Sequence, residues 1–213
     1  MSLIIGFAVD GSARAVDIRE FVHETQQSSN ANQQMSMVWW IPPEFWDVAL
    51  AGNPNITPKN AADIRAAFDG YQLFAIVRAG AGIGGLTTSQ TPAELMGNAR
   101  FLVEGKAIQP LAPEEVPPAM QTMLGAMRPL LSNMLGQLGQ NMVLVVYPGM
   151  LDGHPLIDPL KSGSFQYSLY DQTFHWRMPL ASLLPKRLDP KTHEEFPGNY
   201  VYNPYTGDKL SSK

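Results

Sequence analysis

The sequence predicts a mixed fold of the α/β (or α+β) class, in which helices pack on a mixed sheet and a small β tail ends the chain. Three observations favour this class. Segments of strand and helix character alternate over roughly the first 80 residues. Two alternating segments within 165–178 flank a polar turn, so antiparallel strands are expected late in the chain. Apolar residues make up 45% of the chain, which is enough to bury a sizeable core.

The N-terminal elements are read from hydrophobic spacing. Residues 3–9 form a short apolar run that predicts a strand, and apolar residues follow at helical spacing over 15–22. The polar segment 26–34 predicts a loop. Residues 35–41 are apolar on both faces, as in a buried strand.

The next elements have clear start and stop signals. Pro42-Pro43 ends the preceding strand, and 44–50 is a candidate short helix. A longer helix begins after Thr57, which is suited to be its N-cap, and ends before Gly70. Residues 71–78 then predict another buried strand. Because strands and helices alternate, we expect at least some parallel pairing.

Elements of the second half are less regular. A short helix is expected after Thr91-Pro92 and a strand at 100–104. Methionine and leucine side chains recur at helical spacing over 120–138, and Pro129 should kink or break that helix between Gly125 and Leu131. The last strands are expected at 142–147 and in a hairpin around Asp171-Gln172. We divide the chain into a main domain, 1–183, and a tail, 184–213.

The composition disfavours several classes of function. The chain has no cysteine, which excludes disulfides, zinc–cysteine sites and thiolate catalysis. Its net charge of −4 disfavours a dedicated nucleic-acid binder, since no basic surface would neutralise the phosphates. No segment has the pattern of a membrane span or of a signal peptide. We therefore expect a cytoplasmic protein with no cofactor, no metal and no nucleic-acid partner.

The tail contains a short internal repeat, in which 189–196 aligns with 203–210. Each copy reads acid or amide, Pro, any residue, Thr and a turn residue, and an apolar residue follows. The pattern resembles the paired knuckles of a zinc ribbon. The four cysteine positions of that family are occupied here by Asp189, Thr192, Asn203 and Thr206.

The resemblance implies a small β module without metal ligands. Oxygen atoms of Asp189 and Asn203 can accept the turn N–H bonds that thiolates accept in a knuckle, so we expect each to bond an N–H two or three residues on. Two unrelated Pro-Thr turns, or a metal site that includes His193, are the alternatives.

Two segments suggest a nucleotide site. Gly80, Gly82 and Gly85 match a G-x-G-x-x-G pattern directly after a predicted strand, although no helix start follows at once. The run that ends in Asp10-Gly11-Ser12 resembles the opening of universal stress proteins, which implies that Asp10 and Ser12 approach a nucleotide. We nevertheless expect a flexible glycine loop that binds no dinucleotide, because no helix N-terminus directly follows it, and a plain helix cap at Ser12; the nucleotide site is the alternative.

Other candidate ligand-binding groups are a histidine loop and an aromatic cluster. Asp152, His154 and Asp158 place three polar side chains in one loop, which is either a site or ordinary turn material. Trp40 and Trp46 belong to an aromatic group that lines a pocket or fills the core.

No catalytic residues can be assembled from the sequence. We therefore expect a non-catalytic protein that binds a partner protein or a small ligand. The alternative is a nucleotide-binding enzyme or sensor that uses the segment Gly80–Gly85 and Asp10.

Overall fold

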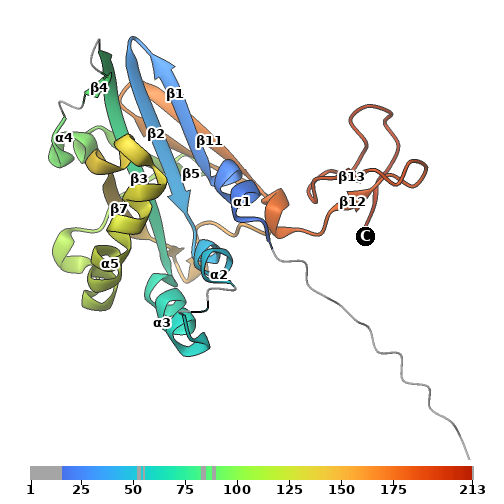
Figure 1. The fold of residues 1–213 in the computed structure, drawn as a ribbon, viewed down its shortest axis with the longest axis horizontal. Coiled ribbons are helices and arrows are strands. Elements are labelled where there is room, and N and C mark those ends of the chain that lie inside the picture. Colours follow the sequence, from blue (N-terminus) through green and yellow to red (C-terminus); the bar gives the residue numbers. More distant parts are fainter. Residues whose placement is uncertain (1–15, 52–53, 55, 83–84, 88–89, 213) are drawn as a thin grey trace, which may run out of the picture.

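The structure, a computed structural model, describes residues 16–51, 54, 56–82, 85–87 and 90–212. Helices, a first sheet and a second sheet are arranged as three layers (Figure 1). The predicted combination of helices and sheets is confirmed. The α-helices are α1 (Ile18–Thr25), α2 (Glu44–Leu50), α3 (Pro58–Phe68), α4 (Pro92–Gly97) and α5 (Pro118–Met134), and the 3-10 helices are η1 (Pro113–Glu115), η2 (Gly136–Asn141) and η3 (Ala181–Leu183).

The first sheet has the order β1-β2-β3-β4, and β7 also pairs with β3. The second sheet has the order β11-β10-β5-β6. The strands of the first sheet are β1 (Gln26–Ala31), β2 (Gln34–Ile41), β3 (Tyr71–Gly82), β4 (Gly85–Thr87) and β7 (Val143–Pro148). Those of the second are β5 (Ala99–Val103), β6 (Lys106–Ile108), β10 (Gly163–Leu169) and β11 (Gln172–Met178).

Each described strand pair is antiparallel, so the expected parallel pairing is not found among the described residues. Two helices, α2 and α3, connect β2 to β3, and the chain returns along the sheet in the opposite direction. Tight hairpins join several of the other pairs. The alternation of strands and helices was therefore a correct sign of the fold class but not of the pairing direction.

The predicted loop at 26–34 is also wrong, because this segment contains β1 and the turn into β2. Asn32 and Gln33 form the turn with φ values of 52° and 61°, as tight hairpin turns require. β1 lies at the edge of the sheet with side chains that reach solvent, so a strand there needs few apolar residues.

The start and stop signals around α3 are confirmed. Thr57 caps the helix by accepting a hydrogen bond from the Asn60 N–H at 3.2 Å, and Gly70 follows with a φ of +78°. The short helix α4 begins after Thr91 as predicted, with a reciprocal bond between Thr91 and Glu94.

The helix does not break at Pro129, because α5 continues through that residue to Met134, and the kink, which is the other expected possibility, stays a prediction. Pro129 cannot bond the carbonyl of Gly125, but both residues are exposed, and solvent can bond that carbonyl instead. Met120 and Leu131 of the same helix are fully buried in the core, as the spacing predicted.

The core between the two sheets is aromatic. Phe74 of β3 contacts the rings of Phe101, Phe165 and Tyr167 from the second sheet. A buried hydrogen bond of 3.0 Å joins the hydroxyls of Tyr147 and Tyr167, and burial raises the pKa of Tyr147 to about 12. These contacts hold the two sheets face to face.

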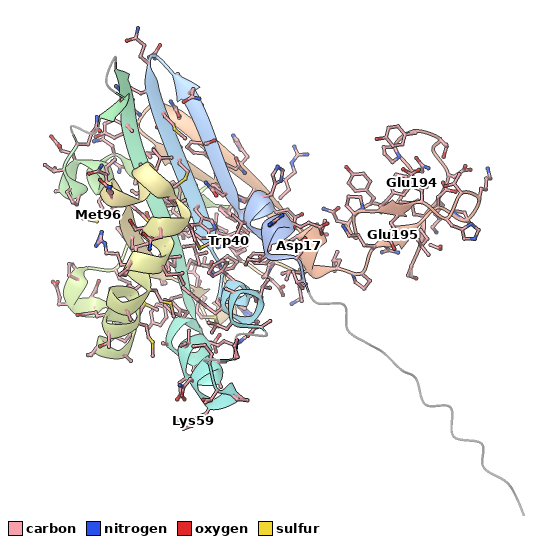
Figure 2. The ribbon with its side chains drawn as sticks, viewed as in Figure 1. Asp17, Trp40, Lys59, Met96, Glu194 and Glu195 are labelled. Atoms are coloured by element: carbon pink, nitrogen blue, oxygen red, sulfur yellow. The ribbon has the colours of Figure 1, made fainter. Side chains whose placement is uncertain are left out.

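The tail lies beside the main body (Figure 1) and carries Glu194 and Glu195, whereas Trp40 lies inside the body (Figure 2). Its strands are β12 (Arg187–Leu188), β13 (Glu195–Phe196) and β14 (Ser211–Ser212), in the order β13-β12-β14. Lys186 contacts Glu20 of α1 through an ion pair of 2.8 Å. That residues 184–213 form a separate domain stays a prediction.

The first turn of the tail repeat is built around Asp189. Its Oδ1 atom accepts hydrogen bonds from the N–H groups of Lys191 and Thr192 at 2.8 and 3.0 Å. The Thr192 hydroxyl in turn accepts one from the Glu194 N–H at 3.3 Å. These are the hydrogen bonds that the sequence predicted for the turn.

The second turn repeats this pattern fourteen residues later. Asn203 Oδ1 accepts hydrogen bonds from Tyr205 N–H and Thr206 N–H at 2.9 and 3.4 Å, and the Thr206 hydroxyl accepts one from Asp208 N–H at 3.3 Å. The internal repeat is therefore present in the backbone as well as in the sequence.

The assignment to the zinc-ribbon family is nevertheless wrong. The chain has no cysteine, and no group of three or more His, Cys, Asp or Glu side chains among the described residues could hold a metal ion, His193 included. Instead, Asn203 Nδ2 donates a hydrogen bond of 2.7 Å to Asp189 Oδ2, and both residues are buried. The side-chain oxygens of Asp189 and Asn203 accept hydrogen bonds from the backbone N–H groups of the turns without a metal ion, so the repeat does not indicate a metal-binding module.

Candidate functional site

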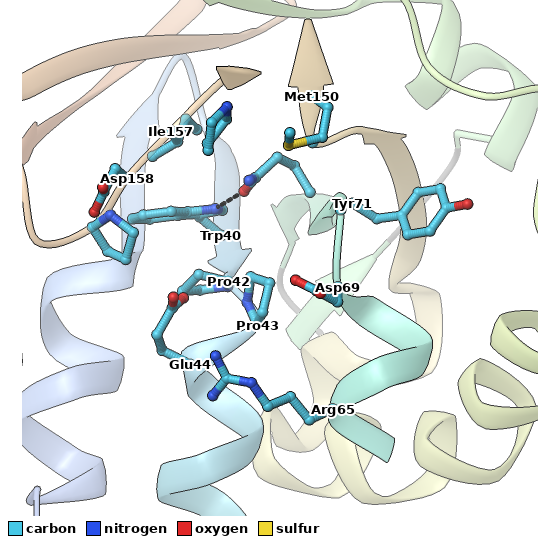
Figure 3. A pocket seen from close by; sticks show the side chains of 15 residues that line it. Trp40, Pro42, Pro43, Glu44, Arg65, Asp69, Tyr71, Met150, Ile157 and Asp158 are labelled. Carbon is cyan, nitrogen blue, oxygen red and sulfur yellow. Dashed lines mark hydrogen bonds between the residues drawn. The ribbon is translucent and has the colours of Figure 1, made fainter. Parts of the chain in front are cut away.

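A pocket of about 230 Å³ opens at one end of the first sheet, where β2 ends and β3 begins (Figure 3). We name it the acidic pocket. Its lining comes from the β2–α2 junction (Trp40, Pro42, Pro43, Glu44), from the end of α3 and the start of β3 (Arg65, Asp69, Gly70, Tyr71, Gln72), and from the segment after β7 (Gly149, Met150, Pro155, Ile157, Asp158, Pro159).

Trp40 and Gln72 form the floor of the acidic pocket. Both side chains are buried, and the indole Nε1 of Trp40 donates a hydrogen bond of 2.8 Å to Gln72 Oε1 (Figure 3). The Trp40 ring also packs edge-on against Phe165 of the second sheet, with ring centroids 4.9 Å apart. The floor is therefore fixed by a hydrogen bond and by core packing.

A close approach of two glycines holds the segment after β7 against the end of α3. The Gly149 N–H donates a hydrogen bond of 2.7 Å to the carbonyl of Gly70. A Cβ atom at Gly149 would lie 2.6 Å from the Gly70 carbonyl carbon, which is closer than real Cβ contacts. Only glycine fits at position 149 without a shift of this part of the pocket.

Three carboxylates line the acidic pocket. Glu44 and Asp69 lie on either side of Pro42 and Pro43, and Asp158 lies beside Trp40 (Figure 3). The one cation among the lining residues is Arg65, which forms an ion pair with Asp47 outside the lining. Asp158 likewise forms an ion pair of 2.8 Å with Lys161, which is also outside the lining. The negative charge of the pocket therefore comes mainly from Glu44 and Asp69.

Glu44 is the least satisfied of these carboxylates. Its Oε2 atom is buried and has no hydrogen-bond partner among the described residues. Burial raises the pKa of Glu44 above its ordinary value of 4.5, and the Asp158 and Asp69 carboxylates raise it further, whereas a hydrogen bond from its own backbone N–H and the charge of Arg65 lower it. A buried carboxylate oxygen without a donor is costly, and a bound N–H group would relieve that cost.

A second cavity of about 240 Å³ adjoins the acidic pocket, and we name it the second cavity. The short hairpin of β8 (Met150–Leu151) and β9 (His154–Pro155) contributes to the linings of both cavities. The second cavity is lined by Val103, Glu104, Lys106 and Ile108 from the β5–β6 hairpin and by Leu151, His154, Pro155 and Leu156.

The structure distributes the predicted ligand-binding residues over several places. Trp40 lines the acidic pocket, but Trp46 is buried in the core, stacked on Phe68 with ring centroids 4.5 Å apart. His154 lines the second cavity and Asp158 the acidic pocket. Asp152 forms the β8–β9 turn with a φ of 52°, so the three polar residues of that loop do not share one site.

The residues of the alternative nucleotide site are described only in part. Asp10 and Ser12 lie outside the described residues. Gly80 and Gly82 belong to β3, and Gly85 begins β4, which pairs antiparallel with β3. A pyrophosphate site requires a helix N-terminus directly after the third glycine, and a strand stands there instead.

Sequence reasoning missed Glu44, Arg65 and Asp69. One available signal was that Glu44 follows the proline pair directly after a buried aromatic strand. A second signal was that Asp69-Gly70 separates α3 from a buried strand, so the Asp69 carboxylate must lie at one end of the sheet. The convergence of both with residues 149–159 could not be read from the sequence.

Comparisons of this chain with protein-family models, with curated proteins and with solved structures give no match. None of the helices in the described part of the chain is both long and apolar enough to cross a membrane.

Proposed function

We propose that this protein is a non-catalytic binding protein whose acidic pocket takes a small organic cation, such as a protonated primary amine with an apolar body. The observation that carries the proposal is the buried Glu44 Oε2 without a hydrogen-bond donor, in a pocket that also holds Asp69 and Asp158. An ammonium group supplies three N–H donors and the opposite charge.

The other lining residues support the same class of ligand. Pro42, Pro43 and Ile157 offer apolar surface next to the carboxylates, which suits the carbon skeleton of an amine. Arg65 is already paired with Asp47 and adds little attraction for an anion. The phosphates of a nucleotide, the alternative ligand, would meet three carboxylates in this pocket.

The test is a titration of the full chain with n-propylamine, followed by calorimetry and by amide NMR shifts. Propionate serves as a probe of similar size and opposite charge. We expect saturable binding of propylamine, shifts at residues of the acidic pocket, and no such binding of propionate. Glu44→Gln should abolish the binding, whereas Glu114→Gln, at an exposed carboxylate outside the pocket lining, should leave it unchanged.

Two results would contradict the proposal. One is the absence of saturable amine binding at this pocket. The other is equal binding of propionate, which would mean that charge does not select the ligand. ATP and NAD are included as probes, and a saturable shift with either of them in place of propylamine would favour the nucleotide alternative.

A further inference from the structure

Two ion pairs offset part of the charge around the acidic pocket. Asp158 of the lining pairs with Lys161 at 2.8 Å, and Arg65 of the lining pairs with Asp47 of α2. Each of these pairs joins one charge of the lining to an opposite charge outside it. These two cations are therefore engaged before a ligand arrives.

Glu44 and Asp69 are the two lining carboxylates without an ion pair in the part of the chain that the structure describes. The Glu44 Oε2 atom is buried, whereas Asp69 is an exposed residue. Burial raises the pKa of Glu44 most, and the charge of Asp69 raises it as well, so the two carboxylates act on each other. The pocket thus presents two uncompensated negative charges, one of them buried and one exposed.

The packing of α2 on α3 fixes the separation of these two carboxylates. Glu44 is the first residue of α2, and Asp69 directly follows α3. Trp46 of α2 stacks on Phe68 of α3 with ring centroids 4.5 Å apart, and the ion pair of Arg65 joins the same two helices. A ligand that reaches both carboxylates must therefore match one separation.

Apolar surface lies between the two carboxylates. Pro42 and Pro43 separate Glu44 from Asp69 in the lining (Figure 3). Proline has no N–H donor, and the carbonyl groups of these two residues already accept hydrogen bonds from α2 at 2.9 and 3.2 Å. This surface suits a methylene chain better than a polar linker.

We infer that the ligand of the acidic pocket is a linear diamine, with one ammonium group at Glu44, the other at Asp69 and its methylene chain across Pro42 and Pro43. This inference rests on the proposed function and specifies its ligand class. Both amino groups of an alkyl diamine are charged at pH 7, since they resemble the lysine side chain. The two ammonium groups offset both uncompensated carboxylates.

The first experiment compares n-butylamine with 1,4-diaminobutane on the full chain at pH 7, by calorimetry. The two probes share one carbon chain and differ in the second ammonium group. A diamine that used one end only would gain the statistical factor that two equivalent ends give. We expect a further gain of about threefold to fivefold, as for a favourable exposed ion pair, because Asp69 is exposed.

The length of the diamine is the second variable. The series is 1,3-diaminopropane, 1,4-diaminobutane and 1,6-diaminohexane, each compared with the monoamine of the same chain length. The gain of diamine over monoamine should peak at one length, because a linker is most effective when it matches the span of the two sites. An equal gain at every length would contradict a second ammonium group held at a fixed carboxylate.

Variants at Asp69 locate the second ammonium group. Asp69→Asn keeps the shape of the side chain but removes its charge, so the ratio of the two affinities should fall to the statistical factor. Asp69→Glu keeps the charge and should keep the gain. The matched control is Asp63→Asn, at an exposed carboxylate of α3 outside the lining, which should leave the ratio unchanged. Saturable butylamine binding by each variant shows that its pocket is formed.

The outcomes separate the two proposals. If butylamine binds but diaminobutane gains no more than the statistical factor, this inference is wrong and the proposed function stands. If the further gain persists in Asp69→Asn, the second ammonium group binds elsewhere and the inference is also wrong. If none of the amines binds at the pocket, the proposed function fails and this inference fails with it.

Discussion

The side-chain amide of Gln27 hydrogen-bonds both backbone groups of His175. Its Nε2 donates to the His175 carbonyl at 2.6 Å, and its Oε1 accepts from the His175 N–H at 3.3 Å. Gln27 lies on β1 at the edge of the first sheet, and His175 lies on β11 at the edge of the second. One side chain thus takes the place of a neighbouring strand and joins two edges that could otherwise pair with other chains.

We expect Gln27→Ala to lower the free energy of unfolding by about 1–2 kcal/mol, because both hydrogen bonds are lost. It should also increase self-association, since the β11 edge loses its cover. Urea denaturation and light scattering measure the two effects. Ser28→Ala, at the next and exposed position of β1, is the control. An unchanged midpoint would show that the amide does not hold the edges together.

Glu44→Gln is expected to stabilise the unbound protein at neutral pH while it abolishes amine binding. The pKa of Glu44 is raised in the folded state, so ionisation opposes folding, and this contribution destabilises the fold as pH rises through that pKa. The neutral amide of glutamine removes it. Thermal denaturation at pH 4 and pH 7 should show a gain only at the higher pH. A loss of stability at pH 7 would contradict the raised pKa.

Asp189 should show the opposite pH dependence. Hydrogen bonds from Asn203 and from the Thr192 and Lys191 N–H groups lower its pKa from 3.8 to about 2. The stability that this carboxylate contributes is present above pH 4 and is lost as pH falls towards 2. A carboxyl ¹³C NMR titration measures the pKa directly. A midpoint near 3.8 would show that the hydrogen bonds to Asp189 are not formed.

Substitutions of Asn203 test the contact between the two turns. Asn203→Ala should cost on the order of 1 kcal/mol or more, because Asp189 loses a donor and the second turn loses its acceptor. Asn203→Asp keeps the acceptor but places a second carboxylate against Asp189, so its cost should be larger at pH 7 and smaller at pH 3. Equal stability of the two variants at pH 7 would argue against the direct contact.

Gly149→Ala should disturb the acidic pocket. The new methyl group would meet the backbone of Gly70, and relief of that clash should cost about 1–3 kcal/mol and weaken propylamine binding. Gly97→Ala, where a Cβ meets nothing within 4 Å, is the matched control. Thermal denaturation and calorimetry of both variants make the comparison. Wild-type behaviour of Gly149→Ala would mean that this close approach does not occur in solution.

Local signals in the sequence predicted local structure well. Thr57 and Gly70 mark the start and the end of α3. The internal repeat of the tail predicted that the side chains of Asp189 and Asn203 accept hydrogen bonds from backbone N–H groups of their turns. These features depend on a few neighbouring residues whose side chains bond the adjacent backbone. They need no knowledge of the rest of the chain.

Features that depend on distant parts of the chain could not be predicted. The polar strand β1 is held by its pairing with β2 and by the contact of Gln27 with β11. The carboxylates of the acidic pocket come together only because β7 pairs with β3 and brings Asp158 to the end of α3. Composition cannot show such pairing, since it is set by the packing of the whole fold.

The contact between Gly70 and Gly149 joins a segment that is synthesised early to one that is synthesised much later. The chain leaves the ribosome N-terminus first, and domains generally fold as units in that order. Residues 40–72 supply nine of the fifteen lining residues early, but residues 149–159 supply the other six much later. A nascent chain that ends before this second segment has no complete pocket. Under the proposed function, an amine would stabilise only a chain that contains both segments, and it would not assist the folding of the N-terminal half.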